Sequence, residues 1–117
     1  MQISSKGLKL IKKFEIEGSH ELVGDILLAK IAKFEGYLNN LLQSFKLELN
    51  QNQFDALISF LSTEQTFSKP MLERFKGKAI NELGECILFY NRKDGEVCPT
   101  LIARRNAEED LFFQSKY

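Results

Sequence analysis

One long apolar stripe constrains the fold of this chain more than any other feature of its sequence. Between residues 25 and 45, large apolar side chains recur at steps of three and four residues, which is the period of one face of an α-helix. The stripe consists of Leu27, Ile31, Phe34, Leu38, Leu41 and Phe45. Gly36 lies inside it, but a single glycine weakens a helix without ending it. The pattern therefore predicts one long helix over residues 25–45 whose apolar face packs against other elements.

Helical periodicity also covers most of the remaining chain. Further helices are expected over residues 4–15, 51–61, 70–76, 78–91 and 100–113. Ser4 or Ser5, Asn50 and Thr100 are the predicted N-caps, because short polar side chains accept hydrogen bonds from the first turn of a helix. The residues expected to anchor the last helix in the core are Leu101, Ile102, Leu111 and Phe112.

Strands are not indicated, because no run shows sustained period-two alternation. Lys93-Asp94-Gly95 predicts a turn. The chain of 117 residues has the length of one ordinary domain with a single core. The prediction is an all-α fold of about six helices in one domain, residues 1–117.

Charge and composition narrow the class of partner. The 16 Lys and Arg residues balance the 16 Asp and Glu residues, so the formal net charge is zero. A nucleic-acid partner usually leaves a basic footprint, and a positive field favours encounter with an anionic wall polymer. The balance therefore argues against both. No apolar run approaches the ~20 residues that span a bilayer, and residues 1–7 lack the features of a secretory signal, which predicts accumulation in the cytoplasm.

Metal and redox sites are not indicated either. Cys86 and Cys98 lie twelve positions apart, which is not the spacing of a zinc or redox motif. In a reducing compartment we expect free thiols there. His20 is the single histidine, and one histidine without Cys or Asp partners makes a poor metal site. No metal or cofactor is predicted.

Three segments resemble parts of lambdoid-phage lysozymes, or endolysins. Residues 3–15, ISSKGLKLIKKFE, are similar to the N-terminal helix of that family, which leads into the active-site cleft. Residues 50–60, NQNQFDALISF, resemble its central buried helix, and residues 101–112, LIARRNAEEDLF, its C-terminal Arg-Arg helix. The segment 89–97 resembles the stretch before that helix. An Arg-Arg pair alone ordinarily indicates a solvated face, but three matches in order make chance a poor explanation. The resemblance implies a lysozyme-like helical lobe.

The resemblance also implies which residues to test for catalysis. Lysozymes need one protonated carboxylic acid and a second carboxylate across the scissile bond. In the family the acid is the Glu that ends the first helix, which corresponds here to Glu15. Glu17 is a rival, because Glu17-Gly18 restores the Glu-Gly pair of the family. An Asp and a Thr follow on a small β-hairpin that forms the other wall of the cleft.

That second wall is missing from this sequence. At the family's spacing from Glu15 stand Gly24 and Lys30, and at that spacing from Glu17 stand Ile26 and Ala32. Only about a dozen residues separate Glu15 from the apolar stripe, too few for two strands, their turn and the connections. The small β-lobe is therefore expected to be deleted.

Other parts of the site also depart from the family. Asp25 is the nearest surviving carboxylate, and its two interpretations are an N-cap of the long helix, which we favour, and a second catalytic carboxylate. Residues 61–64, LSTE, replace the Asn- and Gly-containing turn that lines the family's substrate groove.

These departures favour a degenerate lysozyme-like protein without muramidase activity that acts as a binding or regulatory module. The alternative is a minimal peptidoglycan-hydrolysing endolysin in phage-mediated lysis, with Glu15 as general acid and Asp25 or a partner's carboxylate completing the pair. Peptidoglycan glycan is the expected partner if activity survives. A third hypothesis makes the face exposed by the lost lobe an interface for a protein partner or a second copy of the chain.

Overall fold

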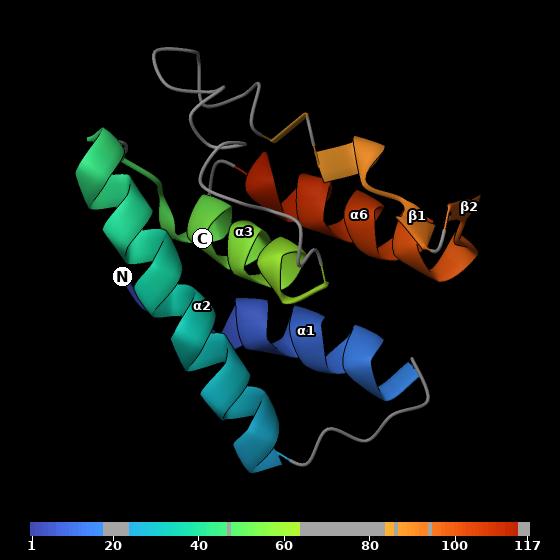
Figure 1. Cartoon of the computed structure of the whole chain (residues 1–117), viewed down its shortest axis with the longest axis horizontal. Coiled ribbons are helices and arrows are strands. Elements are labelled where there is room, and N and C mark those ends of the chain that lie inside the picture. Colours follow the sequence, from blue (N-terminus) through green and yellow to red (C-terminus); the bar gives the residue numbers. More distant parts are fainter. Residues whose placement is uncertain (18–23, 47, 64–83, 86, 94, 115–117) are drawn as a thin grey trace.

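Four α-helices make up most of the computed structural model, which describes residues 1–17, 24–46, 48–63, 84–85, 87–93 and 95–114. The helices are α1 (Ser5–Glu17), α2 (Gly24–Phe45), α3 (Gln51–Thr63) and α6 (Pro99–Phe112). The 3₁₀-helix η1 (Ile87–Phe89) and the strands β1 (Arg92–Lys93) and β2 (Glu96–Val97) precede α6. Helix α3 lies between the other three helices and contacts each of them (Figure 1).

The three helices predicted in the first half of the chain are confirmed, with ends that differ by one or two residues at most. The largely helical character of the fold is confirmed with them. The helix expected over 70–76, and residues 78–83 and 86 of the one expected over 78–91, lie outside the described residues, so the total of six stays a prediction.

Helix α3 forms where the sequence places its cap. The backbone N–H of Gln53 donates to Asn50 Oδ1 at 2.8 Å, and the backbone N–H of Asn50 donates to Gln53 Oε1 at 2.9 Å. This reciprocal pair satisfies two backbone donors at the start of the helix. Because three helices surround α3, its apolar residues are almost completely buried: Phe54, Ala56, Leu57, Ile58, Phe60 and Leu61.

Helix α1 is held to α3 through its N-cap. Ser4 Oγ accepts the N–H of Gly7 at 3.4 Å, and the buried carboxylate of Asp55 in α3 accepts the backbone N–H of Ser4 at 3.0 Å. The Ser4 hydroxyl and the side-chain amide of Gln51 also donate to Asp55. A Cβ at Gly7 would lie 2.6 Å from Asp55 Cβ, so a glycine lets the two helices approach this closely.

Helix α2 crosses α3 with the predicted stripe turned inward. Ile31, Leu38 and Leu41 are buried, and Phe34 packs partly buried against them. The side chains of Leu27 and Phe45 lie outside the described residues. Gly36 is on the exposed side, and a Cβ there would meet nothing within 4 Å.

Replacing Gly36 by alanine is expected to stabilise the protein by about 1 kcal/mol, because alanine loses less backbone entropy in a helix and meets no obstacle here. Urea unfolding should show a higher midpoint with an unchanged slope. Gly95→Ala is the matched control: Gly95 has φ +83°, a conformation that alanine disfavours, so its midpoint should fall. An unchanged or lower midpoint for Gly36→Ala would contradict this account of α2.

The segment before α6 differs from its prediction. Residues 87–91 are not α-helical: η1 closes with a hydrogen bond from the Tyr90 N–H to the Ile87 carbonyl at 3.2 Å. A short antiparallel hairpin follows, with Arg92 opposite Val97 and Lys93 opposite Glu96. This hairpin makes the expectation of a chain without strands wrong. The sequence did not indicate the hairpin, because two residues per strand are too few to show alternation. Gly95 lies in the turn that the sequence predicted.

Helix α6 begins one residue earlier than expected. Cys98 is its N-cap and Pro99 its first residue, so the prediction of Thr100 as the cap is wrong. Proline suits this position because its fixed φ is helical and its missing N–H has no partner there. Leu111 and Phe112 are buried as predicted, but Ile102 is 37% exposed. Ile102 does not anchor α6, because charged side chains occupy much of its inner face.

Candidate functional site

The predicted catalytic acids lie at two helix ends. Glu15 and Glu17 are in the last turn of α1, and Asp25 is in the first turn of α2, which begins at Gly24. Asp25 is therefore inside the helix and not at the cap position, although a negative charge in a first turn still favours a helix. The side chains of these three residues, and the whole of His20, lie outside the described residues.

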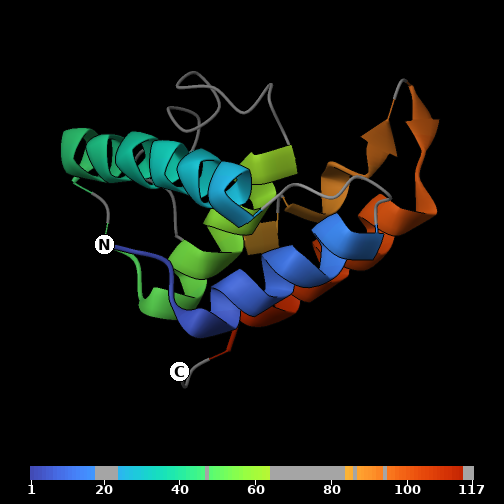
Figure 2. The same cartoon turned by 90° about the horizontal axis from the view of Figure 1, so that it is seen from below.

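The two helix ends are not side by side. Figures 1 and 2 both show the last turn of α1 and the first turn of α2 apart from each other. Glycosidases of either stereochemistry hold their two carboxyl groups about 5–9.5 Å apart across one bond. The arrangement of α1 and α2 does not bring the turn of Asp25 to the turn of Glu15 and Glu17.

The connection between these helices is short. Helix α1 ends at Glu17 and α2 begins at Gly24, which leaves residues 18–23 between them. Six residues cannot contain two strands, a turn and the links to both helices. The described hairpin lies elsewhere in the chain, before α6, and its paired residues are Arg92, Lys93, Glu96 and Val97. None of these is the Asp or Thr that a second cleft wall would supply.

A buried polar cluster lies beside the end of α1. Its members come from α3 and α6: Ser59, Ser62, Arg104, Arg105 and Glu108. The Arg104 guanidinium lies 5.8 Å from the ring centre of Phe14, the residue before Glu15. Helices α1 and α6 run in opposite directions here (Figure 2), and at their other ends Lys6 donates to the side-chain amide oxygen of Gln114. We call the five buried polar residues from α3 and α6 the Arg-Glu cluster.

Glu108 is the centre of the Arg-Glu cluster and is fully buried. Its Oε1 accepts Arg105 Nη1 at 2.6 Å, and its Oε2 accepts Arg104 Nε at 3.3 Å. The Ser59 hydroxyl donates to the same Oε2. A buried carboxylate survives only when such partners replace its hydration. Glu108 therefore accepts hydrogen bonds from both helices and joins α6 to α3 at the centre of the cluster.

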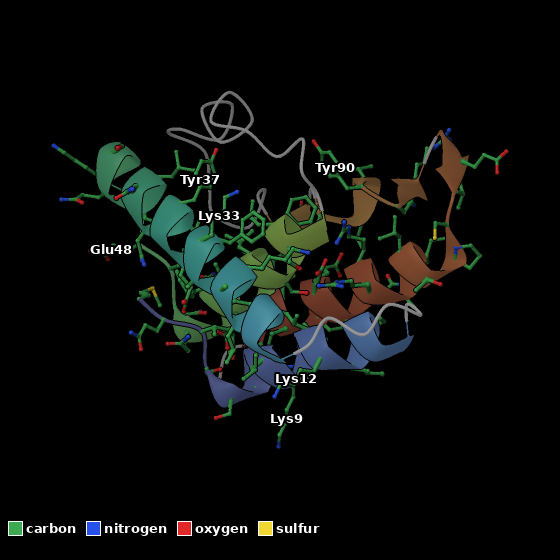
Figure 3. All side chains as sticks on the ribbon, turned by 60° about the horizontal axis from the view of Figure 1, so that its bottom comes forward. Lys9, Lys12, Lys33, Tyr37, Glu48 and Tyr90 are labelled. Carbon is green, nitrogen blue, oxygen red and sulfur yellow. The ribbon has the colours of Figure 1, made fainter. Side chains whose placement is uncertain are left out.

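The two arginines extend the cluster to other elements. Arg104 Nη2 donates to the Ser59 carbonyl at 3.2 Å and to Ser62 Oγ at 2.7 Å. Arg105 Nε donates to the carbonyl of Tyr90 at 2.7 Å, and its guanidinium lies 4.7 Å from the ring centre of Phe60. The cluster thus connects α3, α6 and the segment after η1, where Tyr90 is labelled in Figure 3.

The Arg-Arg pair does not lie on a solvated face, where such pairs are ordinarily found, because both arginines are buried. The signal that identifies them is the spacing of Glu108 at three and four residues after them, since a carboxylate at those spacings lies on the same helix face. Ser59 and Ser62, which interrupt the apolar side of α3, are the second signal.

No metal site is found in the described ranges. They contain no group of three His, Cys, Asp or Glu residues placed to hold a metal ion. Cys98 is a half-buried free thiol, and Cys86 lies outside the described residues. Among the described helices none is both long and apolar enough to cross a bilayer.

Comparison with known proteins places these elements in one family. The phage lysozyme family model matches residues 8–108, which run from the first helix to the central glutamate of the Arg-Glu cluster. No curated protein matches the chain.

Proposed function

We propose that this chain, which belongs to the phage lysozyme family, is a lysozyme-like protein without muramidase activity. It would be retained as a binding or regulatory module. The substrate of the family is peptidoglycan. The observation that carries the proposal is the connection of six residues between α1 and α2, which is too short for the cleft wall that bears the second half of the catalytic machinery.

The chemistry depends on that wall. A general acid must be kept protonated by apolar surroundings, and a second carboxylate must lie across the glycosidic bond. Among the described residues, no hairpin that bears an Asp and a Thr follows Glu15 to exclude water or supply the partner. The helical core that supports the wall in an active enzyme is retained, from the capped α3 to the Arg-Glu cluster. Retention of the core without the wall favours a role that needs the fold but not the reaction.

The alternative is a minimal endolysin in which Glu15 is the general acid. It needs a second carboxylate, and the separation of the α1 and α2 ends speaks against Asp25 in that role. A carboxylate from a partner molecule would then have to complete the pair.

A peptidoglycan assay tests the proposal directly. We expect purified peptidoglycan incubated with the protein to release no more soluble fragments than a buffer blank. The Glu15→Gln variant should give the same result, and an active phage lysozyme serves as the positive control. Release at a rate comparable with that control, lost in Glu15→Gln, would refute the proposal in favour of the minimal endolysin. Release of soluble fragments that is unchanged in the Glu15→Gln variant would refute both the proposal and the minimal endolysin.

The same samples also test the kind of binding. Sedimentation of the protein with the insoluble peptidoglycan indicates that the glycan is its ligand. If the protein stays in the supernatant, the partner is a protein or a second copy of the chain, and sedimentation velocity distinguishes self-association from a monomer.

A further inference from the structure

Residues 1–3 precede the first helix and lie between α2 and the start of α3 (Figure 2). Helix α2 holds them through their main chain. Asn39 Oδ1 accepts a hydrogen bond from the Met1 nitrogen, and Asn39 Nδ2 donates to the Met1 carbonyl, both at 2.8 Å. One turn earlier on α2, Glu35 Oε2 accepts the N–H of Ile3 at 2.7 Å. We call residues 1–3 the strap.

Helix α3 holds the other side of the strap with a second pair of polar side chains. Gln51 Nε2 donates to the carbonyl of Gln2 at 2.7 Å and to Asp55 Oδ1 at 2.8 Å. Asp55 also accepts the N–H of Ser4, the residue after the strap, at 3.0 Å. In both helices the two members of the pair are four residues apart, which places them on one helix face. Two polar pairs from two helices therefore form one groove, which we call the main-chain groove.

The main-chain groove recognises a peptide backbone. The hydrogen bonds that α2 and α3 make with the strap all end on main-chain nitrogen and oxygen atoms. A segment of different sequence offers the same donors and acceptors, as does a peptide that adds a strand to the edge of a sheet. The groove by itself thus gives affinity for an extended segment, and specificity must come from a neighbouring feature.

A pocket of about 380 Å³ adjoins the main-chain groove and supplies that feature. Its size lies in the range of pockets that bind ligands, roughly 300–1,000 Å³. Leu42 and Leu49 are half-buried and Glu48 is exposed, so the pocket combines an apolar wall with a carboxylate. Figure 3 labels Glu48 beside α2. The residues that line the pocket are Met1, Asn39, Leu42, Gln43, Glu48 and Leu49.

From these observations we propose that the main-chain groove binds an extended segment of a partner protein, with the strap as its intramolecular competitor. The partner segment carries an arginine at the position of Met1. The aliphatic stem of an arginine covers Leu42 and Leu49, and its guanidinium donates to the carboxylate of Glu48. Methionine cannot make that ion pair, so the partner gains a contact that the strap lacks. The inference names a partner for the binding module of the proposed function and rests on that function.

The strap is held weakly enough to be displaced. Met1 and Gln2 are exposed, and Ile3 packs half-buried against the core. Segments with few buried contacts open locally at a small cost in free energy. A short tether gives the strap an effective concentration of about millimolar, so we expect free peptides to bind weakly and reversibly.

NMR titration of the full chain with five-residue peptides tests the proposal. Acetyl-RQISS-amide should shift the side-chain amide signals of Asn39 and Gln51 to saturation, and should bind about fivefold more tightly than acetyl-MQISS-amide. In Glu48→Gln this preference should fall below about twofold. It should persist in the matched control Glu96→Gln, which neutralises an exposed acid of β2. The RQISS peptide with an N-methylated isoleucine lacks the N–H for Glu35 and should bind about fivefold more weakly.

A variant of the strap tests its role as competitor. Ile3→Pro removes the N–H that is donated to Glu35, so the strap competes less and acetyl-RQISS-amide should bind about fivefold more tightly. Ile3→Ala is the matched control, because it removes the same side chain but keeps the N–H. Its gain in peptide affinity should be smaller than that of Ile3→Pro.

Four outcomes would overturn the proposal. They are amide signals that do not reach saturation, equal affinities of the RQISS and MQISS peptides for the parent chain, undiminished binding of the N-methylated peptide, and no greater affinity in Ile3→Pro than in Ile3→Ala. None of these readouts involves peptidoglycan. A failure here is therefore distinguishable from a failure of the proposed function, which the release of soluble peptidoglycan fragments reports.

Discussion

Replacing Glu108 by glutamine is expected to lower the free energy of unfolding by about 3–5 kcal/mol. Glutamine nearly preserves the size of the side chain, so the expected loss is electrostatic. The Arg-Glu cluster already holds two guanidinium groups for one carboxylate, and Arg105 Nη2 has no hydrogen-bond acceptor. Without the carboxylate, two cations would remain buried with no anion between them. A protein of this size is stable by only about 5–15 kcal/mol, so the loss is a large fraction of the total.

Urea unfolding measures this change, with Glu109→Gln as the matched control. Glu109 is the next residue of α6, is only half-buried, and is not a partner in the ion pairs of the Arg-Glu cluster. Its substitution should stay within about 0.5 kcal/mol. Similar effects for the two variants would mean that the cluster does not hold α6 to α3. Repeating the unfolding at increasing salt concentration gives a second readout. The loss of stability in Glu108→Gln should change little with salt, because buried pairs are screened much less than exposed ones.

Replacing Phe54 by alanine should cost about 3–5 kcal/mol, since the side chain is fully buried in α3 and its removal leaves a cavity. Phe89→Ala makes the same chemical change on η1, where the side chain is 82% exposed. It should change stability by no more than about 0.5 kcal/mol. Chemical unfolding of the two variants side by side gives the comparison. Comparable losses of stability in the two variants would mean that the core is not centred on α3.

Sequence periodicity predicted the helices that bury apolar side chains. The stripe of α2 and the Asn50 cap of α3 are local signals, so both helices were recognised with nearly correct ends. Helix α6 was recognised, but its inner side was misassigned to apolar anchors such as Ile102. Its actual inner side contains Arg104, Arg105 and Glu108, whose burial depends on Ser59 and Tyr90 from distant parts of the chain. Periodicity of apolar residues cannot detect such a polar interior.

The candidate site was predictable only in part. The position of Glu15 at the end of the first helix followed from its resemblance to a family helix, and α1 indeed extends through it. Whether Asp25 could pair with it depends on the angle between α1 and α2, which no local pattern contains.

The central place of α3 has a consequence for the order in which the protein completes its fold during synthesis. Asp55 of α3 accepts a hydrogen bond from Ser4, which is synthesised before it. Ser59 of α3 donates to Glu108, which is synthesised 49 residues after Ser59. A nascent chain that has reached only α3 can assemble α1, α2 and α3, while the side of α3 that receives α6 stays uncovered. Ribosome stalling before residue 99 should therefore leave a three-helix intermediate that molecular chaperones recognise through exposed apolar surface.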